Sequence, residues 1–239
     1  MTAALQTLGL SRRFGGLTAA AGVDFTLPRG ARQALIGPNG AGKTTFVNLL
    51  SGALRADAGR ILLEGCDITR ATASARARMG LSRSFQINQI FPSLTATEAV
   101  ALALAVAERG GADVAAETAA LIDRLGLAEV RDTPARRLGY GQQRLLELAI
   151  ALAGRPRVLL LGEPAAGPSE SERRGLLARL SDLPPEVSVL MIEHDMELVF
   201  SFADRISVMV DGRILAEGPP AEIAADPRVR AVYLGGCDG

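Results

Sequence analysis

The fold is decided by residues 37–45, which read Gly37-Pro38-Asn39-Gly40-Ala41-Gly42-Lys43-Thr44-Thr45. This stretch fits the pattern GxxxxGK[ST], follows the apolar run 34–36 and opens a helical pattern over residues 44–50. Its glycines let successive backbone N–H groups turn toward one anion, the following helix presents its positive end, Lys43 adds a charge, and the Thr44 hydroxyl can ligate Mg²⁺. A chance glycine-rich turn is the alternative, but the required order of strand, loop, Lys-Thr and helix is present. The stretch therefore predicts a phosphate-binding loop for a nucleoside triphosphate.

Composition limits the classes of protein that remain. With 239 residues and 48% hydrophobic content, the chain can bury one sizeable core and a smaller subdomain. Basic and acidic residues number 26 each and no basic run stands out, so the charge pattern of a nucleic-acid binder is missing. Cys66 and Cys237 match neither a metal-ligand spacing nor a disulfide framework, which favours a reducing compartment.

The sequence predicts no segment that crosses a membrane. Its most apolar run, residues 99–107, lies between Glu98 and Glu108 and is far shorter than the ~20 residues that a spanning helix needs. Residues 1–10 lack the charged start and apolar middle of a secretory signal. We therefore expect any role at a membrane to depend on a partner.

Hydrophobic periodicity predicts an α/β chain with a helical block inserted into a β-rich frame. Strand patterns cover residues 5–10, 23–27, 32–36, 59–63, 158–161, 188–192, 205–210 and 213–217. One helical pattern starts at residue 43 and stops at Gly52. Further helical patterns cover residues 70–79, 97–108, 114–125, 142–153, 170–180 and 196–202.

Further motifs follow the phosphate loop in a fixed order. They are Gln86 after the segment 81–85, Leu138-Gly139-Tyr140-Gly141-Gln142-Gln143-Arg144 before a helix, Gly162-Glu163-Pro164 after an apolar strand, and Glu193-His194-Asp195 after another. This order resembles the ATP-binding subunit of an ABC transporter, and the resemblance covers essentially the whole chain. Residues 14–17, 84–86, 164–167 and 232–236 are similar to those of the branched-chain amino acid or urea uptake group.

The resemblance implies a single ABC ATP-binding domain over residues 1–239. Its P-loop NTPase (RecA-like) core, with an antiparallel β element, would comprise about residues 1–86 and 154–239, and the helical subdomain about residues 87–153. The implied ligands are ATP and Mg²⁺. The implied partners are a second ATP-binding subunit, membrane permease subunits and, indirectly, a solute-binding protein, whereas nucleic acid is not expected. The chain would lie at the cytoplasmic face of the inner (plasma) membrane, with Phe91 and Pro92 near the permease.

The resemblance also assigns roles around this chain's own nucleotide. Phe14 would stack on adenine, an ordinary core or surface aromatic being the alternative. Lys43 and the loop amides would hold the phosphates, and Thr44 with Gln86 would contact the metal or the attacking water, although a lone Gln is more often a surface residue. Glu163 would act as general base, with a helix-start carboxylate as its alternative.

Two more assignments concern the γ-phosphate. His194, the only histidine, follows the strand pattern 188–192, and parallel sheets place ligands at the carboxyl ends of strands. The resemblance makes it the γ-phosphate sensor in place of an ordinary packing histidine. The segment Gly139-Tyr140-Gly141-Gln142 would offer a helix N-terminus to the γ-phosphate of a nucleotide held mainly by a second subunit.

Several positions depart from the family pattern. Gly162 stands where the family usually has the Mg²⁺-orienting aspartate, and losing such a partner typically costs ~10- to 100-fold in metal affinity or activity. Gly139 stands where many members have serine, and Pro168-Ser169 differs from the usual Leu-Asn or Met-Asn. With a different second subunit, Gly162 would affect this chain's own site and Gly139 the partner's site, whereas in a homodimer both sites would carry both changes.

These departures keep an alternative open, namely a subunit that binds ATP but barely hydrolyses it. A non-transport ABC protein would more often carry two cassettes or a basic or coiled-coil extension, which this chain lacks. A phosphate-loop kinase remains the least favoured reading, because such proteins lack the motif at residues 138–142.

Overall fold

The computed structural model describes residues 3–84, 90–107, 113–164 and 170–234. The strands are β1 (Ala3–Phe14), β2 (Leu17–Pro28), β3 (Arg32–Ile36), β4 (Ala58–Leu63), β5 (Cys66–Asp67), β6 (Leu81–Ser84), β7 (Val158–Gly162), β8 (Ser188–Ile192), β9 (Arg205–Val210) and β10 (Arg213–Gly218). The helices are α1 (Lys43–Ser51), α2 (Ala73–Arg78), α3 (Ala96–Ala107), α4 (Val114–Arg124), α5 (Tyr140–Ala153), α6 (Glu170–Ser181), α7 (Met196–Phe202), α8 (Pro220–Ala225) and α9 (Pro227–Leu234). Short 3-10 turns cover Ala128–Val130 and Ala135–Arg137.

A six-stranded sheet forms the centre of the molecule, in the order β10-β9-β3-β8-β7-β6. All of its pairings are parallel except that of β10 with β9. Leu35 of β3 is paired with Ile192 of β8, which is in turn paired with Gly162 of β7. The carboxyl ends of these three strands are therefore aligned at one edge, where parallel α/β sheets bind ligands.

Successive residues of the central strands face opposite layers, as the two-residue period of a strand requires. Leu159, Leu161 and Met191 belong to the core shared with helices α3 to α9. Leu160 and Leu190 belong to a second core that includes Phe46 and Leu50 of α1. Because both faces are covered, β7 and β8 are almost completely buried.

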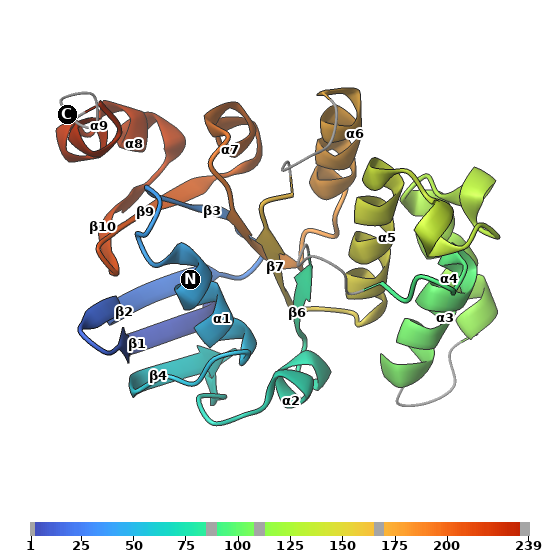
Figure 1. Ribbon diagram of the computed structural model, residues 1–239, viewed down its shortest axis with the longest axis horizontal. Coiled ribbons are helices and arrows are strands. Elements are labelled where there is room, and N and C mark those ends of the chain that lie inside the picture. The colour runs from blue at the N-terminus through green and yellow to red at the C-terminus, as the bar shows by residue number, and fades with distance from the viewer. Residues whose placement is uncertain (1–2, 85–89, 108–112, 165–169, 235–239) are drawn as a thin grey trace.

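A four-stranded antiparallel sheet, in the order β2-β1-β4-β5, forms the second layer. Figure 1 shows α1 between this sheet and the central one, and the second core joins all three elements. The ring of Phe25 on β2 meets the ring of Phe46 on α1 edge to face, with centroids 5.5 Å apart. The helix that follows the phosphate loop is thus held from both sides.

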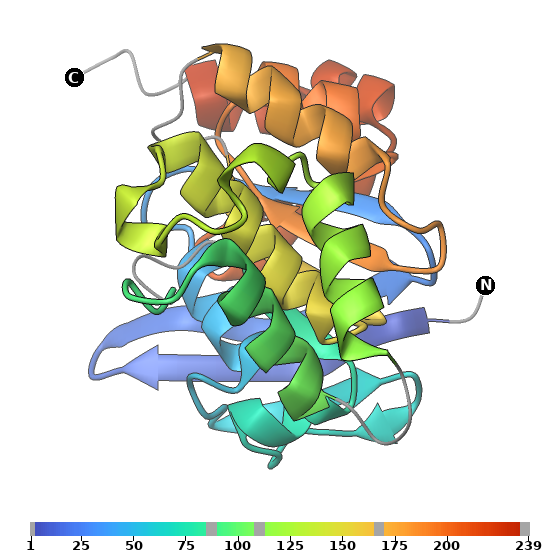
Figure 2. The same cartoon turned by 90° about the vertical axis from the view of Figure 1, so that its right-hand side faces the viewer.

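Helices α3, α4 and α5 form a third group, in front of the sheet in the view of Figure 2. Helix α5 packs against α3 and α4 and also against β6 of the central sheet. Leu146 of α5 accordingly lies in the same buried cluster as Leu159 of β7 and Val100 of α3. The expected α/β fold with an antiparallel β element and an inserted helical segment is confirmed, and the helical segment shares the core of the sheet.

Element boundaries show where periodicity falls short. Residues 5–10 and 23–27 were expected as strands, but β1 and β2 extend to a hairpin at Gly15-Gly16 that pairs Phe14 with Leu17. The expected helix over residues 70–79 begins only after Thr72, whose hydroxyl accepts the N–H of Ala75 and caps α2. None of the described helices is long and apolar enough to cross a membrane.

Candidate functional site

The phosphate loop passes from β3 into α1 through glycines that leave no room for a side chain. Gly37 has φ 153° and Gly42, the N-cap of α1, has φ 100°. A Cβ would lie 2.1 Å from the carbonyl oxygen of Met209 at Gly37, and 2.1 Å from that of Ala19 at Gly42. Positive φ and contact with neighbouring backbone both require glycine here, so the spacing predicted from sequence has a steric basis.

Lys43 lies half-buried at the first position of α1. Its Nζ donates to the carbonyl oxygens of Gly37, at 2.6 Å, and Pro38, at 2.9 Å. Burial lowers the pKa of Lys43, and the carboxylate of Glu163 opposes that shift by its charge. The ammonium group is therefore held at the loop and lies within electrostatic reach of Glu163.

Glu163 follows β7 and is exposed. Its backbone N–H donates to the carbonyl oxygen of Ile192 at 2.8 Å. Its φ of 49° is left-handed, a conformation that costs a residue other than glycine about 1–3 kcal/mol. The carboxylate thus leaves the sheet at the edge where the phosphate loop begins, in a strained backbone that such functional positions often show.

His194 lies at the same edge, after β8, with its side chain 68% exposed. The preceding residue, Glu193, is fully buried, and its Oε2 accepts the backbone N–H groups of His194 and Asp195 at 3.0 and 3.4 Å. Asp195 caps α7 by accepting the N–H of Leu198. Glu193 therefore fixes the backbone from which the histidine projects, although the sequence analysis gave it no role.

The first turn of α5 contains the segment Gly139 to Gln142. The Gln142 side chain returns to accept the N–H of Gly139 at 3.0 Å. Tyr140 is 45% exposed, and its hydroxyl accepts a hydrogen bond from Arg144 at 2.7 Å. The N–H of Gly141 donates to Oε1 of Glu172 on α6 at 3.1 Å. Among the described residues, an anionic side chain that sequence reasoning did not single out thus contacts this turn.

Two aromatic side chains, Phe14 and Tyr233, lie in different surroundings. Phe14 is 46% exposed at the β1–β2 hairpin, and the guanidinium carbon of Arg12 lies 4.9 Å from its ring centroid. Burial raises the pKa of Tyr233 on α9, and the backbone N–H of Gly37 lowers it in part. Tyr233 therefore approaches the start of the phosphate loop from a helix that periodicity did not predict.

The metal expectation has partial support from donor chemistry. Thr44 is exposed at the start of α1, whereas Gly162 supplies no carboxylate at the end of β7. Gln86 and the segment 165–169 lie outside the described residues. Within the part of the chain that the structure describes, no three His, Cys, Asp or Glu side chains gather as a metal site. Mg²⁺ in nucleotide sites is commonly held by one or two carboxylates together with phosphates and water. The hydroxyl of a phosphate-loop Ser or Thr can also ligate it, and Thr44 is in that position.

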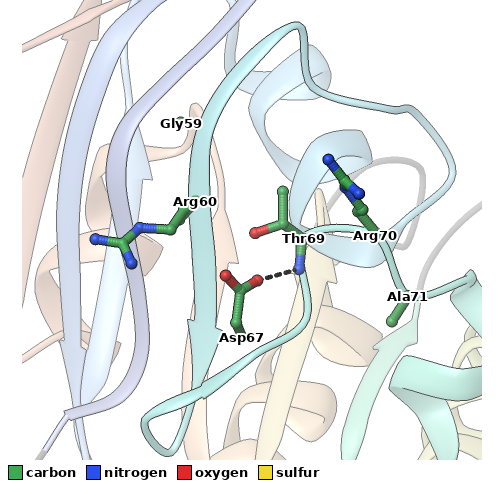
Figure 3. A pocket seen from close by; sticks show the side chains of 6 residues that line it. All are labelled: Gly59, Arg60, Asp67, Thr69, Arg70 and Ala71. Atoms are coloured by element: carbon green, nitrogen blue, oxygen red, sulfur yellow. Dashed lines mark hydrogen bonds between the residues drawn. The ribbon is translucent and has the colours of Figure 1, made fainter.

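A hollow of about 460 Å³ lies elsewhere, beside β4 and β5 (Figure 3). The Asp67 carboxylate accepts the N–H of Thr69 at 2.9 Å, and Gly59, Arg60, Arg70 and Ala71 complete its wall. It includes none of the residues discussed above.

Comparison with protein families places these features in context. A sequence model of the family described as "ABC transporter" matches residues 20–166, and one described as "Branched-chain amino acid ATP-binding cassette transporter" matches residues 213–236. The second match includes β10, α8 and all of α9, and with it Tyr233.

Individual relatives match along nearly their whole length. The chain is 40% identical to the high-affinity branched-chain amino acid transport ATP-binding protein BraF of Pseudomonas aeruginosa, covering 97% of each. It is 36% identical to LivG of Escherichia coli K12, a protein of the same description, again covering 97% of each.

Solved structures show the same fold. A nucleotide-free ATP-binding cassette from an ABC transporter superimposes with a TM-score of 0.86 at 27% identity, covering 97% of this chain and 98% of that one. The ADP conformation of an ATP-binding cassette gives 0.85 at 27% identity, covering 98% and 100%.

Proposed function

The chain belongs to the ABC transporter family, within its branched-chain amino acid ATP-binding cassette group, and from this membership we propose that it hydrolyses ATP to drive an importer. The transported solute would be a branched-chain amino acid or a related small polar solute. Relatives named as branched-chain amino acid transport proteins, matched over nearly their full length, support that assignment.

The observation that carries the proposal is the alignment of three strand ends. Leu35, Ile192 and Gly162 are neighbours in register, so Lys43, His194 and Glu163 follow strands that end at one edge. The carboxylate of Glu163 lies near enough to raise the pKa of Lys43 against the lowering effect of burial, which supports placing both charges at one site. A phosphate group at the loop would therefore meet a cation, a carboxylate and a histidine.

In the proposed reaction the chain's own groups bind and orient. Loop amides and the Lys43 ammonium hold the phosphates, and Phe14 stacks on the adenine. The Glu163 carboxylate accepts a proton from a water molecule whose oxygen bonds to the γ-phosphorus, and the bond to the β–γ bridging oxygen breaks. The products are ADP and inorganic phosphate. His194 donates to the γ-phosphate and so senses its loss.

Mg²⁺ would supply charge neutralisation at the β- and γ-phosphates. The Thr44 hydroxyl is the described side chain suited to hold it, with Gln86 proposed as a second contact from outside the described residues. Without a carboxylate at Gly162, the phosphates and water would provide more of its coordination.

The proposed assembly has a second cassette, identical or different, and membrane permease subunits, with a solute-binding protein acting through them. We place it at the cytoplasmic face of the inner membrane. Phe91, 59% exposed at the end of the segment that follows β6, is proposed to face the permease together with Pro92. The first turn of α5 would meet the γ-phosphate of the nucleotide on the second cassette.

The absence of a carboxylate at Gly162 favours one alternative, a subunit that closes on ATP but turns it over slowly. Losing a supporting metal partner costs about 10- to 100-fold, whereas the amides and Lys43 that bind the nucleotide are intact. Both forms of the proposal predict ATP binding, and they differ in the rate of hydrolysis.

The test compares Mg²⁺-dependent ATP hydrolysis by the wild type, Gly162→Asp and Glu163→Gln, with ATP binding measured in each. A wild-type rate close to that of Gly162→Asp, abolished in Glu163→Gln, supports the working ATPase. Hydrolysis by Gly162→Asp alone identifies the native chain as an ATP-gated clamp. Failure of the wild type to bind ATP contradicts both forms.

A further inference from the structure

Glu172 lies against the N-terminus of α5. Its Oε1 accepts the N–H of Gly141 at 3.1 Å, from a residue 31 positions away in the chain. Gly141 is in the first turn, and the N–H groups of a first turn have no carbonyl partner within their helix. A Cβ at residue 141 would lie 2.5 Å from the same oxygen and 2.8 Å from the carboxyl carbon. The carboxylate can approach the backbone this closely because residue 141 is a glycine.

The Gly141 N–H is also a donor that the proposed function offers to a phosphate. A helix N-terminus favours negative charge, from a side chain or from a ligand. A carboxylate and a phosphate that approach the same N–H compete for it, because their like charges repel at such a distance. One anion must therefore leave before the other binds.

We propose that Glu172 is a built-in anion that occupies the N-terminus of α5 until the γ-phosphate of the second cassette's ATP displaces it. This inference rests on the proposed function, because it takes the first turn of α5 as the site of that γ-phosphate. It assigns Glu172 the part of a positioning residue and competitor, with no contact to the reacting atoms of its own nucleotide.

The next residue connects this contact to the chain's own nucleotide site. Arg173 forms an ion pair with Asp195, which directly follows His194 and caps α7. Helix α6 packs against both α5 and α7 (Figure 1). Its first turn therefore holds the N-terminus of α5 through Glu172 and the His194 segment through Arg173. When a phosphate displaces Glu172, the first turn of α6 loses its contact with α5. The same turn holds the segment of His194 through the ion pair of Arg173 with Asp195.

The chain offers a matched pair of variants. Glu172→Gln removes the charge but keeps the size of the side chain and an accepting oxygen. Glu170→Gln makes the same change two residues earlier on α6, where Glu170 forms an exposed ion pair with Arg174 at 3.4 Å. A difference between the two variants therefore reports the contact with Gly141 and not the net charge of α6. Glu172→Ala serves as the second variant, and the amide spectrum of each protein verifies its fold.

The experiment titrates the ¹⁵N-labelled full chain with inorganic phosphate and follows the amide signals of Gly141 and Gly42. The Gly141 signal reports on the N-terminus of α5, and it can be read in a monomer as well as in a homodimer. We expect the phosphate concentration at half-saturation of the Gly141 signal to fall about tenfold in Glu172→Gln, because charge-assisted hydrogen bonds are roughly twice as strong as neutral ones. The Gly42 curve, which reports the phosphate loop, should stay the same in all proteins, and Glu170→Gln should match the wild type.

Equal Gly141 half-saturation in the wild type, Glu172→Gln and Glu170→Gln would overturn the proposal. So would a Gly141 signal that responds to phosphate in none of the proteins. Failure of the proposed function would appear separately, as a Gly42 signal of the wild type that does not respond to ATP.

Discussion

The ammonium group of Lys43 donates to the carbonyl oxygen of Gly37 across 2.6 Å. These two residues lie at opposite ends of the loop segment that would surround a phosphate, so the lysine closes the loop on itself. A nucleotide must draw Nζ toward its own oxygens. Since burial penalises the ammonium form, the negative charge of a phosphate at the loop would offset that cost.

Lys43 is the only lysine in the sequence, which makes its titration directly measurable. In protein labelled with ¹³C at lysine Cε, one lysine signal should titrate with a pKa below the usual value of 10.5, because burial outweighs the attraction of Glu163. Addition of ATP should raise the pKa, since phosphate charge favours the ammonium form.

The matched variant for this titration is Glu163→Gln. It removes the charge that raises the pKa of Lys43, so the pKa should fall further. An unchanged or higher pKa in this variant would show that Glu163 does not act on the lysine as the geometry indicates.

Phe14 offers a test of the adenine contact. Phe14→Ala should weaken ATP binding about fivefold, because aromatic stacking is worth about 0.5–1.5 kcal/mol, and Phe14→Trp should retain it. The neighbouring Leu17, 67% exposed on the same hairpin, provides the control Leu17→Ala. Calorimetric titration with ATP measures all three, and equal losses in Phe14→Ala and Leu17→Ala would mean that hairpin packing, not stacking, is involved.

Local signals made the phosphate loop predictable. The bounds of β3 and the stop of α1 at Gly52, which is left-handed with φ 81°, follow from apolar runs and from glycine chemistry over a few residues. The shared edge of Glu163 and His194 was also predictable, because both follow buried parallel strands.

Contacts between distant segments were not predictable in the same way. Strand β1 continues through Arg12 and Arg13 because backbone pairing with Ala20 and Thr18 of β2 supports polar residues there. Helices α8 and α9 begin at Pro220 and Pro227, and prolines that read as loop signals are well suited to a first helical position. Glu172 carried no local signal, because its partner Gly141 is 31 positions away.

Arg76 is predicted to be a main support of the phosphate-loop helix. It is 2% exposed and donates Nη1 to the carbonyl oxygens of Leu49 and Leu50, both at 2.6 Å, in the last turn of α1. A cation at this end also complements the helix dipole. Its Nε and Nη2 donate to the carbonyls of Ala71 and Thr69.

We expect Arg76→Met to lower the free energy of unfolding by about 3 kcal/mol, because several buried carbonyl groups lose their donor together. The control is Arg78→Met on the same helix, where the exposed side chain donates to the Ser74 hydroxyl, and it should change stability by less than about 0.5 kcal/mol. Urea unfolding monitored by circular dichroism measures both, and a similar midpoint for the two variants would refute the assignment.

The junction of α8 and α9 should make part of the stability depend on acidic pH. The Arg228 side chain donates to Asp226 at 2.7 Å, and this hydrogen bond is the main reason why the pKa of Asp226 falls from 3.8 to about 2. A depressed carboxyl pKa contributes stability that is fully present above the unfolded value of 3.8 and is lost as the pH falls through about 2.

Asp226→Asn should therefore lower Tm at neutral pH, and its difference in Tm from the wild type should shrink as the pH falls below about 4. Asp132→Asn, which alters a carboxylate 81% exposed beside Arg131, should leave Tm nearly unchanged throughout. Thermal unfolding at a series of pH values measures all three proteins, and a constant difference between Asp226→Asn and the wild type down to the lowest pH would show that the ionised carboxylate does not hold this junction. Because α9 carries Tyr233 to Gly37, a loosened junction should also weaken ATP binding at neutral pH.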